Sequence, residues 1–189
     1  MVKNKQVVLI TGGTSGLGLE ISKHFIKLGY ETIILSKNKS LLKKKFNKYK
    51  NAYPIKLDLR NLKLIKKKIN QIIKKFKKVD ILINNAGLAS NSILEKTNEK
   101  KIIEIININL LAPILLCKQV LKIMKKNNFG RIINISSGGS VNCSAGYLSY
   151  SASKSGLNTL AKTLSKECNG YNIKINSFSP GPCKTKMFP

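Results

Sequence analysis

Six short, mostly apolar runs alternate along the chain with longer stretches in which apolar residues recur every three or four positions. The runs have the length and composition of strands buried on both faces of a parallel sheet. They cover Val7–Thr11, Thr32–Leu35, Tyr53–Leu57, Val79–Ile83, Arg131–Ile135 and Ile173–Phe178. The longer stretches have the spacing of amphipathic helices. They cover Leu17–Leu28, Leu41–Tyr49, Leu62–Phe76, Glu99–Ile106, Leu110–Lys126 and Tyr150–Cys168.

This alternation of strand and helix predicts one fold class. It is α/β, a Rossmann-type doubly wound parallel sheet of about six strands with right-handed crossovers. A length of 189 residues fits one domain, since domains typically hold roughly 100–200 residues. We find no internal repeat, linker or low-complexity segment, so residues 1–189 are expected to form a single domain.

The charge is strongly unbalanced, with 35 Lys and Arg against 8 Asp and Glu and a net charge of +27. Such a balance must be tested against nucleic-acid or membrane binding. Only Arg60 and Arg131 are arginine, and lysines such as Lys66–Lys68 fall between apolar residues at helical spacing. Arginine forks or aromatic stacking platforms, which nucleic-acid readers usually carry, are not interleaved with them. We therefore favour solvated lysine faces, explained with the abundant Asn and Ile by A/T-rich codons, over specific nucleic-acid binding.

The sequence gives little support to a metalloprotein, a histidine-dependent hydrolase or a membrane protein. Cys117, Cys143, Cys168 and Cys183 show no CxxC spacing and His24 is the only histidine, so no metal site or histidine-dependent hydrolase is expected. The cysteines are predicted to be reduced thiols. No run of about 18 apolar residues and no signal peptide stand out, so we expect a cytoplasmic protein that does not enter a membrane.

The segment Thr11 to Gly18 carries the first chemical signal, since its glycines lie between the first strand and the first helix. Glycines there permit a tight turn and let the backbone approach a pyrophosphate at the helix N-terminus. Alone, such a cluster is an ordinary turn. Its place between strand and helix predicts a nucleotide site.

A second signal is the pair Tyr150 and Lys154 at the start of the last helix. Residues four apart lie on one helix face, so a phenol and an ammonium can share a site. The cation stabilises the phenolate, which makes Tyr150 a candidate for proton exchange. Without further context a surface tyrosine and lysine would be the preferred interpretation.

Taken in order, the motifs make the chain resemble the short-chain dehydrogenase/reductase (SDR) family, from Val7 to about Met187. They are the glycine loop Thr11 to Gly18, Asp58, Asn84 to Gly87, Asn109, Ser137, Tyr150 with Lys154, and Pro180 with Gly181.

The resemblance implies four catalytic residues. Tyr150 would give a proton to a carbonyl oxygen, and Lys154 would bind the nicotinamide ribose and stabilise the phenolate. Ser137, rather than its neighbour Ser136, would hydrogen-bond the substrate oxygen. Asn109 would hold a water that links Lys154 to solvent; otherwise it is a helix-kink residue.

The resemblance also implies which residues line the dinucleotide. They are Gly12, Thr14, Ser15, Gly16, Leu17 and Gly18 for the phosphates, Asp58 and Leu59 for adenine, Asn85, Ala86 and Gly87 for the ribose wall, Tyr150 and Lys154 for the nicotinamide ribose, and Pro180, Gly181, Cys183 and Thr185 for the carboxamide. At the end of the second strand, Ser36 and Lys37 replace the acidic residue that would bind the 2′-hydroxyl of NAD. A hydroxyl beside a cation favours NADP(H) over NAD(H).

The chain departs from the resemblance after Pro180, because family members usually add a lid and a seventh strand there. We expect either a naturally short member with an open pocket or a truncated product. A homodimer or homotetramer is expected to form through Leu110–Lys126 and Tyr150–Cys168.

Our interpretation is an NADP-dependent oxidoreductase that interconverts a carbonyl and a secondary alcohol. Candidate substrates are a 3-oxoacyl thioester on an acidic acyl carrier protein, a keto-sugar or another small ketone. The alternative is a catalytically impaired nucleotide-binding or scaffold protein. A nucleic-acid function, the third hypothesis, predicts binding that falls steeply with salt.

Overall fold

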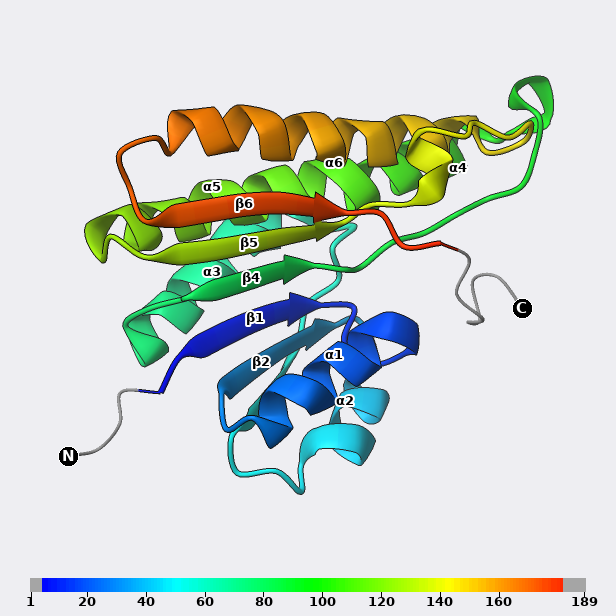
Figure 1. Ribbon diagram of the computed structural model, residues 1–189. Coiled ribbons are helices and arrows are strands. Elements are labelled where there is room, and N and C mark those ends of the chain that lie inside the picture. Colours follow the sequence, from blue (N-terminus) through cyan, green and yellow to red (C-terminus); the bar gives the residue numbers. More distant parts are fainter. Residues whose placement is uncertain (1–4, 182–189) are drawn as a thin grey trace.

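The strands assemble into one parallel sheet in the order β3-β2-β1-β4-β5-β6. The computed structural model describes residues 5–181. Figure 1 shows β2, β1, β4, β5 and β6 side by side. The strand bounds are β1 Val7–Thr11, β2 Glu31–Ser36, β3 Ala52–Lys56, β4 Ile81–Asn84, β5 Gly130–Ile135 and β6 Ile173–Phe178. This order confirms the doubly wound Rossmann-type fold predicted from the alternation of elements.

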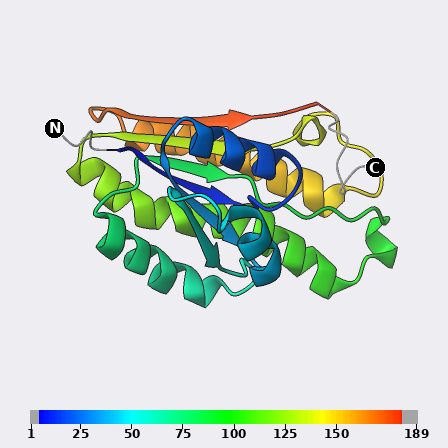
Figure 2. The ribbon, with the colours of Figure 1, turned by 90° about the horizontal axis from the view of Figure 1, so that it is seen from below.

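Helices cover both faces of the sheet, with α1 and α2 on one face and α3, α5 and α6 on the other (Figures 1 and 2). Their bounds are α1 Gly16–Lys27, α2 Lys39–Phe46, α3 Leu62–Phe76, α4 Glu99–Ile106, α5 Ala112–Lys126 and α6 Leu148–Glu167. The apolar side chains of β1 and β2 divide between the two layers. Leu9 and Ile33 enter the core under α3 and α5, whereas Val8 and Ile10 pack beneath α1.

The site is positioned by the strand order. From β1 the chain builds outward through β2 and β3, then returns to the other side of β1 with β4. Between β1 and β4 the connections leave in opposite directions, which opens a crevice at the carboxyl ends of the strands. The glycine loop after β1 and the Asn84 to Gly87 segment after β4 therefore meet there.

The longest helical segment runs without a break from Glu99 to Lys126. It joins α4 and α5, which were predicted as separate stretches, through a π-helical turn at Asn107–Leu111. By length and composition alone it could span a membrane, with a mean hydropathy of 1.5. Ala112, Leu116 and Met124 lie fully buried in the core, so we interpret it as a core helix of the domain.

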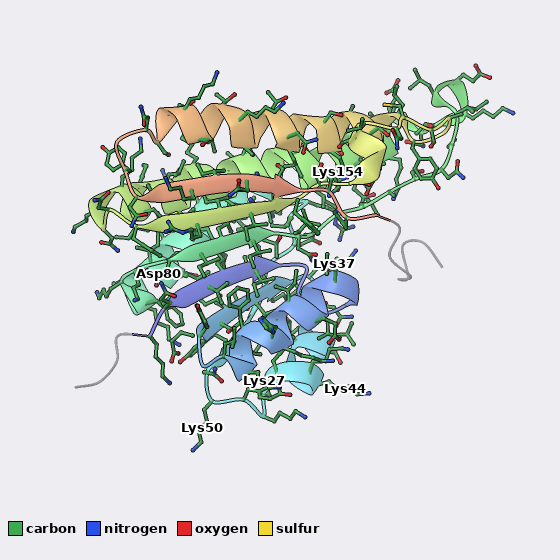
Figure 3. All side chains as sticks on the ribbon, in the orientation of Figure 1. Lys27, Lys37, Lys44, Lys50, Asp80 and Lys154 are labelled. Carbon is green, nitrogen blue, oxygen red and sulfur yellow. The ribbon has the colours of Figure 1, made fainter. Side chains whose placement is uncertain are left out.

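The lysines lie where the helical periodicity placed them. In α3, Ile65 and Ile69 are buried while Lys66 and Lys67 are exposed. Figure 3 shows Lys44 and Lys50 pointing away from the domain, whereas Lys154 lies at the end of the sheet beneath α6. Among the lysines of residues 5–181, Lys154 is the one that is buried, and its burial needs a chemical explanation.

Candidate active site

A cavity of about 730 Å³ opens at the carboxyl ends of the strands. It brings together every described residue that the sequence predicted for the site except Asn109. Those lining it are Gly12, Thr14, Ser15, Gly16, Leu17, Gly18, Ser36, Lys37, Asp58, Leu59, Asn85, Ala86, Gly87, Ser137, Tyr150, Lys154, Pro180 and Gly181. Cys183 and Thr185 lie outside the described residues.

The glycine loop needs its glycines for close approach. Gly12 has a φ of +67°, and a Cβ there would lie 2.8 Å from the Cα of Ala86. A Cβ on Gly18 would lie 2.2 Å from Nδ2 of Asn85. The loop leads directly into α1, whose first turn contains no acidic residue. Its N-terminal amides and the helix dipole thus form a site for an anion.

Thr11 and Asn85 fasten this loop to the segment after β4. The Thr11 Oγ1 accepts hydrogen bonds from the backbone N–H groups of Asn85 and Ala86, each at 3.0 Å. In return Asn85 Nδ2 donates to the carbonyl oxygens of Thr11 and Gly12, at 3.0 and 3.3 Å. The two cavity walls are therefore built as one unit across the crevice.

At one end of the cavity, the hydroxyls of Thr14 and Ser36 lie 3.0 Å apart beside the exposed Lys37. Asp58 is the nearby acidic group, and hydrogen bonds from Arg60 hold the pKa of its carboxyl below the ordinary value, with a smaller contribution from the charge of Lys37. The end of β2 therefore presents a hydroxyl and a cation to the cavity, and the acidic group near them, Asp58, comes from the segment after β3.

Arg60 and Glu104 are two residues of this end that the sequence analysis missed. The Arg60 guanidinium makes a bidentate contact with Asp58 and lies 3.7 Å from Oε1 of Glu104 in α4. Glu104 lines the cavity. These contacts join the loop after β3 to α4, across the mouth of the crevice.

At the other end, Tyr150 and Lys154 project from α6 and are nearly buried, with 6% and 3% of their surfaces exposed. Lys154 Nζ lies 5.7 Å from the centroid of the Tyr150 ring and donates a hydrogen bond of 2.7 Å to the carbonyl oxygen of Ile135. Burial lowers the pKa of the Lys154 amine to about 8. A phenol and an amine that titrates close to neutral pH therefore share one wall of the cavity.

The two neighbouring serines after β5 take different positions. Ser136 is buried and its hydroxyl donates to the carbonyl oxygen of Lys154 at 3.0 Å, which anchors α6 to β5. Ser137 is half-buried, and its Oγ accepts a hydrogen bond of 3.1 Å from the N–H of Gly139. That bond leaves the Ser137 hydroxyl proton available to an acceptor in the cavity.

Asn109 is fully buried behind the cavity, in the π-helical turn. Its Oδ1 accepts from the N–H of Leu88 at 2.8 Å, and its Nδ2 donates to the carbonyl oxygen of Leu88 at 2.9 Å and to Oγ of Ser153 at 3.0 Å. The side chain therefore binds protein groups. A water relay through Asn109 stays a prediction.

These groups fit a nicotinamide dinucleotide. The cavity falls in the range of about 300–1,000 Å³ typical of ligand sites. It combines a helix N-terminus for a pyrophosphate, glycines whose Cβ atoms would collide with the wall, and a buried amine at the far end. Among residues 5–181, no three His, Cys, Asp or Glu side chains gather as metal ligands would.

Comparison with known proteins gives the same assignment. The family model for short chain dehydrogenases matches residues 6–189. The 3-oxoacyl-(acyl-carrier-protein) reductase FabG of Rickettsia felis is 37% identical over 180 residues, which cover 95% of this chain and 73% of the relative. A 3alpha-hydroxysteroid dehydrogenase of Mediterraneibacter gnavus is 32% identical, over 99% of this chain and 77% of the relative.

Solved structures agree at the level of the fold. A short-chain dehydrogenase from Streptomyces avermitilis superposes with a TM-score of 0.93 and 28% identity, covering all of this chain and 70% of that one. An actinorhodin polyketide ketoreductase variant solved with NADPH superposes with a TM-score of 0.92 and 29% identity, covering 99% of this chain and 74% of that one. The chain belongs to the short-chain dehydrogenase/reductase family and is an NAD(P)-dependent oxidoreductase.

Proposed function

We propose that this chain is an NADPH-dependent reductase of 3-oxoacyl thioesters presented by an acyl carrier protein. The observation that carries the proposal is the buried Tyr150 and Lys154 pair, which opens onto the same cavity as the glycine loop. The substrate class is supported by the relative from Rickettsia felis, which is named as a 3-oxoacyl-(acyl-carrier-protein) reductase. A keto-sugar or another small ketone remains the alternative substrate.

The protein residues divide the proton chemistry among them. NADPH, when bound, supplies the hydride. The Tyr150 hydroxyl gives its proton to the carbonyl oxygen, and the Lys154 ammonium stabilises the phenolate left behind. The Ser137 hydroxyl donates a hydrogen bond to the same oxygen and stabilises its developing negative charge. The Ile135 carbonyl fixes where the Lys154 amine lies, and a water held near Asn109 would return the proton.

The preference for NADPH over NADH rests on the end of β2. Ser36 and Lys37 line the cavity there, and the hydroxyl of Thr14 lies 3.0 Å from that of Ser36. A 2′-phosphate would find two hydroxyls and an ammonium, which are the groups that bind phosphate well. An acidic residue at that position would instead repel it.

The partners follow from charge and from exposed faces. A net charge of +27 attracts an acidic carrier protein and steers its approach. The outward faces of α5 and α6 are the surface we assign to a homodimer or homotetramer. We place the enzyme in the cytoplasm and give it no specific nucleic-acid or membrane partner.

The test is reduction of 3-oxoacyl thioesters with NADPH, compared between the parent and Tyr150→Phe. Removing the proton donor should lower kcat by about 10²- to 10⁴-fold, while NADPH binding, followed by its fluorescence, is retained. Tyr171→Phe is the matched control, since Tyr171 is exposed and does not line the cavity.

Two outcomes contradict the proposal. One is a parent that binds NADPH but reduces no carbonyl compound, which returns the interpretation to a non-catalytic nucleotide-binding protein. The other is a Tyr150→Phe variant that reduces thioesters as fast as the parent does.

A further inference from the structure

Ser153 lies between the two residues of the proton-transfer pair, at the point where three elements meet. We propose that Ser153 is a positioning residue, which holds the first turn of α6 in register with Asn109 and the segment after β4. The inference rests on the proposed function for its catalytic readout. The hydrogen bonds that position Ser153 lie within the chain and do not depend on the proposed function.

The Ser153 hydroxyl is fully buried and uses both its donor and an acceptor site. It donates a hydrogen bond of 2.7 Å to the carbonyl oxygen of Tyr150 and accepts one of 3.0 Å from Asn109 Nδ2. A serine that bonds back to its own helix usually weakens that helix, because it competes with the backbone ladder. The second hydrogen bond of Ser153, which it accepts from Asn109, joins α6 to another element and explains why a serine lies at this position.

Asn109 links Ser153 to the segment after β4. Its other two hydrogen bonds go to the N–H and the carbonyl of Leu88, so its amide pairs with the Leu88 backbone as a neighbouring strand would. The π-helical turn at Asn107–Leu111 is what turns Asn109 inward here. Leu88 lines the cavity directly after Gly87.

Hydrogen bonds thus run from the Leu88 backbone through Asn109 and Ser153 to the carbonyl of Tyr150. Each of these groups is polar, and both Asn109 and Ser153 are without solvent exposure. Removing the Ser153 hydroxyl leaves an N–H of Asn109 without that acceptor in a buried place, which is costly. The turn carrying Tyr150 and Lys154 then shifts relative to the cavity wall.

The experiment compares Ser153→Ala with Ser177→Ala. Ser177 is a matched control, because its hydroxyl also donates to a carbonyl of α6, that of Leu157, and it does not line the cavity. A displacement of the reacting groups by a fraction of an ångström should lower kcat by about 10-fold in Ser153→Ala, with KM for NADPH within about twofold. Ser177→Ala should keep the parent kcat.

A second readout needs no turnover. Competitive labelling of Lys154 with acetic anhydride, measured by peptide mass spectrometry across pH, should show a midpoint near 8 in the parent. In Ser153→Ala the midpoint should rise towards that of exposed lysines, because water enters beside the loosened turn. Should Ser153→Ala not fold, Ser153→Cys takes its place, since it keeps the shape of the side chain with a somewhat larger atom and weakens the hydrogen bonds.

The proposal is overturned if a folded variant keeps both the parent kcat and the parent labelling midpoint, or if Ser177→Ala loses kcat equally. A parent that reduces no carbonyl defeats the proposed function instead. In that case the Lys154 labelling profile still decides the role of Ser153.

Discussion

Lys154 carries its amine into an almost closed environment, and burial holds its pKa near 8, against an ordinary value of 10.5. The unfolded chain therefore binds more protons than the folded chain between these two pH values, so stability rises with pH across that window. The folded protein bears the full cost of the buried charge below about pH 8, and that cost disappears above about pH 10.5.

Replacing Lys154 with methionine removes this cost. We expect the free energy of unfolding of the parent to rise by about 2 kcal/mol relative to Lys154→Met between pH 7 and pH 9.5. Urea unfolding at the two pH values measures the difference. Lys27→Met is the control, since Lys27 is exposed and should show no such change. Parallel pH profiles for the parent and Lys154→Met would contradict the assignment.

Lys37 decides the preference between the two dinucleotides if a 2′-phosphate sits at the end of β2. Losing one charge-assisted hydrogen bond at an exposed site should weaken NADPH binding by about 10-fold in Lys37→Ala. NADH binding should stay within about twofold, because NADH carries no 2′-phosphate for the ammonium to bind. Fluorescence titration of both cofactors measures this, with Lys44→Ala as the exposed-lysine control. Equal losses for NADPH and NADH would speak against a phosphate contact.

At the scale of elements, the junction between β1 and α1 tolerates no side chain at Gly18. A Cβ there would lie 2.5 Å from the carbonyl oxygen of Gly12 and closer still to the Asn85 amide. Gly18→Ala should lower the free energy of unfolding by about 1–3 kcal/mol through overpacking and abolish the stabilisation of Tm by NADPH. Thermal unfolding with and without NADPH tests this.

The control is Gly29→Asn, after α1. Gly29 has a φ of +84°, and a Cβ added there meets nothing within 4 Å. Asparagine tolerates this conformation better than most residues, so the variant should keep its response to NADPH. A Gly18→Ala protein that NADPH still stabilises would show that the loop adapts.

The bounds of a helix could be predicted from the sequence where packing against the sheet alone determines them. The amphipathic pattern predicted α3 at Leu62–Phe76, which the structure confirms. The pattern predicted a break between Ile106 and Leu110, where the structure has a π-helical turn. That turn is stabilised by bonds from Asn109 to residues distant in sequence, and no local pattern encodes such bonds.

The residues of the site also divide into those that the sequence predicted and those that it missed. Residues held in ordered motifs, such as Tyr150 with Lys154, were found from sequence because helical spacing and family resemblance both point to them. Arg60 and Glu104 were missed because they lie 44 positions apart and meet only through the fold. Ser153, which lies between Tyr150 and Lys154, received no role, since nothing in its neighbours in the sequence indicates Asn109 as its partner.

For the whole molecule, a net charge of +27 should affect large acidic substrates more than small ones. If a carrier protein docks by charge, raising the salt from about 0.05 to 0.5 M should increase KM for the carrier-bound thioester several-fold, because screening shortens the reach of surface charges. KM for a short thioester without carrier should change little. Steady-state kinetics at both salt concentrations checks this. An equal salt effect on both substrates would rule out docking by charge.

The two edges of the sheet differ in a way that concerns the behaviour of the protein at high concentration. β3 carries Pro54, which has no N–H to offer a neighbouring strand. β6 contains no proline, and within residues 5–181 no strand pairs with its outer side. With a net charge of +27, repulsion between copies opposes the pairing of such edges, and salt weakens that repulsion. If β6 forms an open edge of the sheet in solution, added salt should promote self-association along it, and storage and crystallisation should favour buffers of low ionic strength.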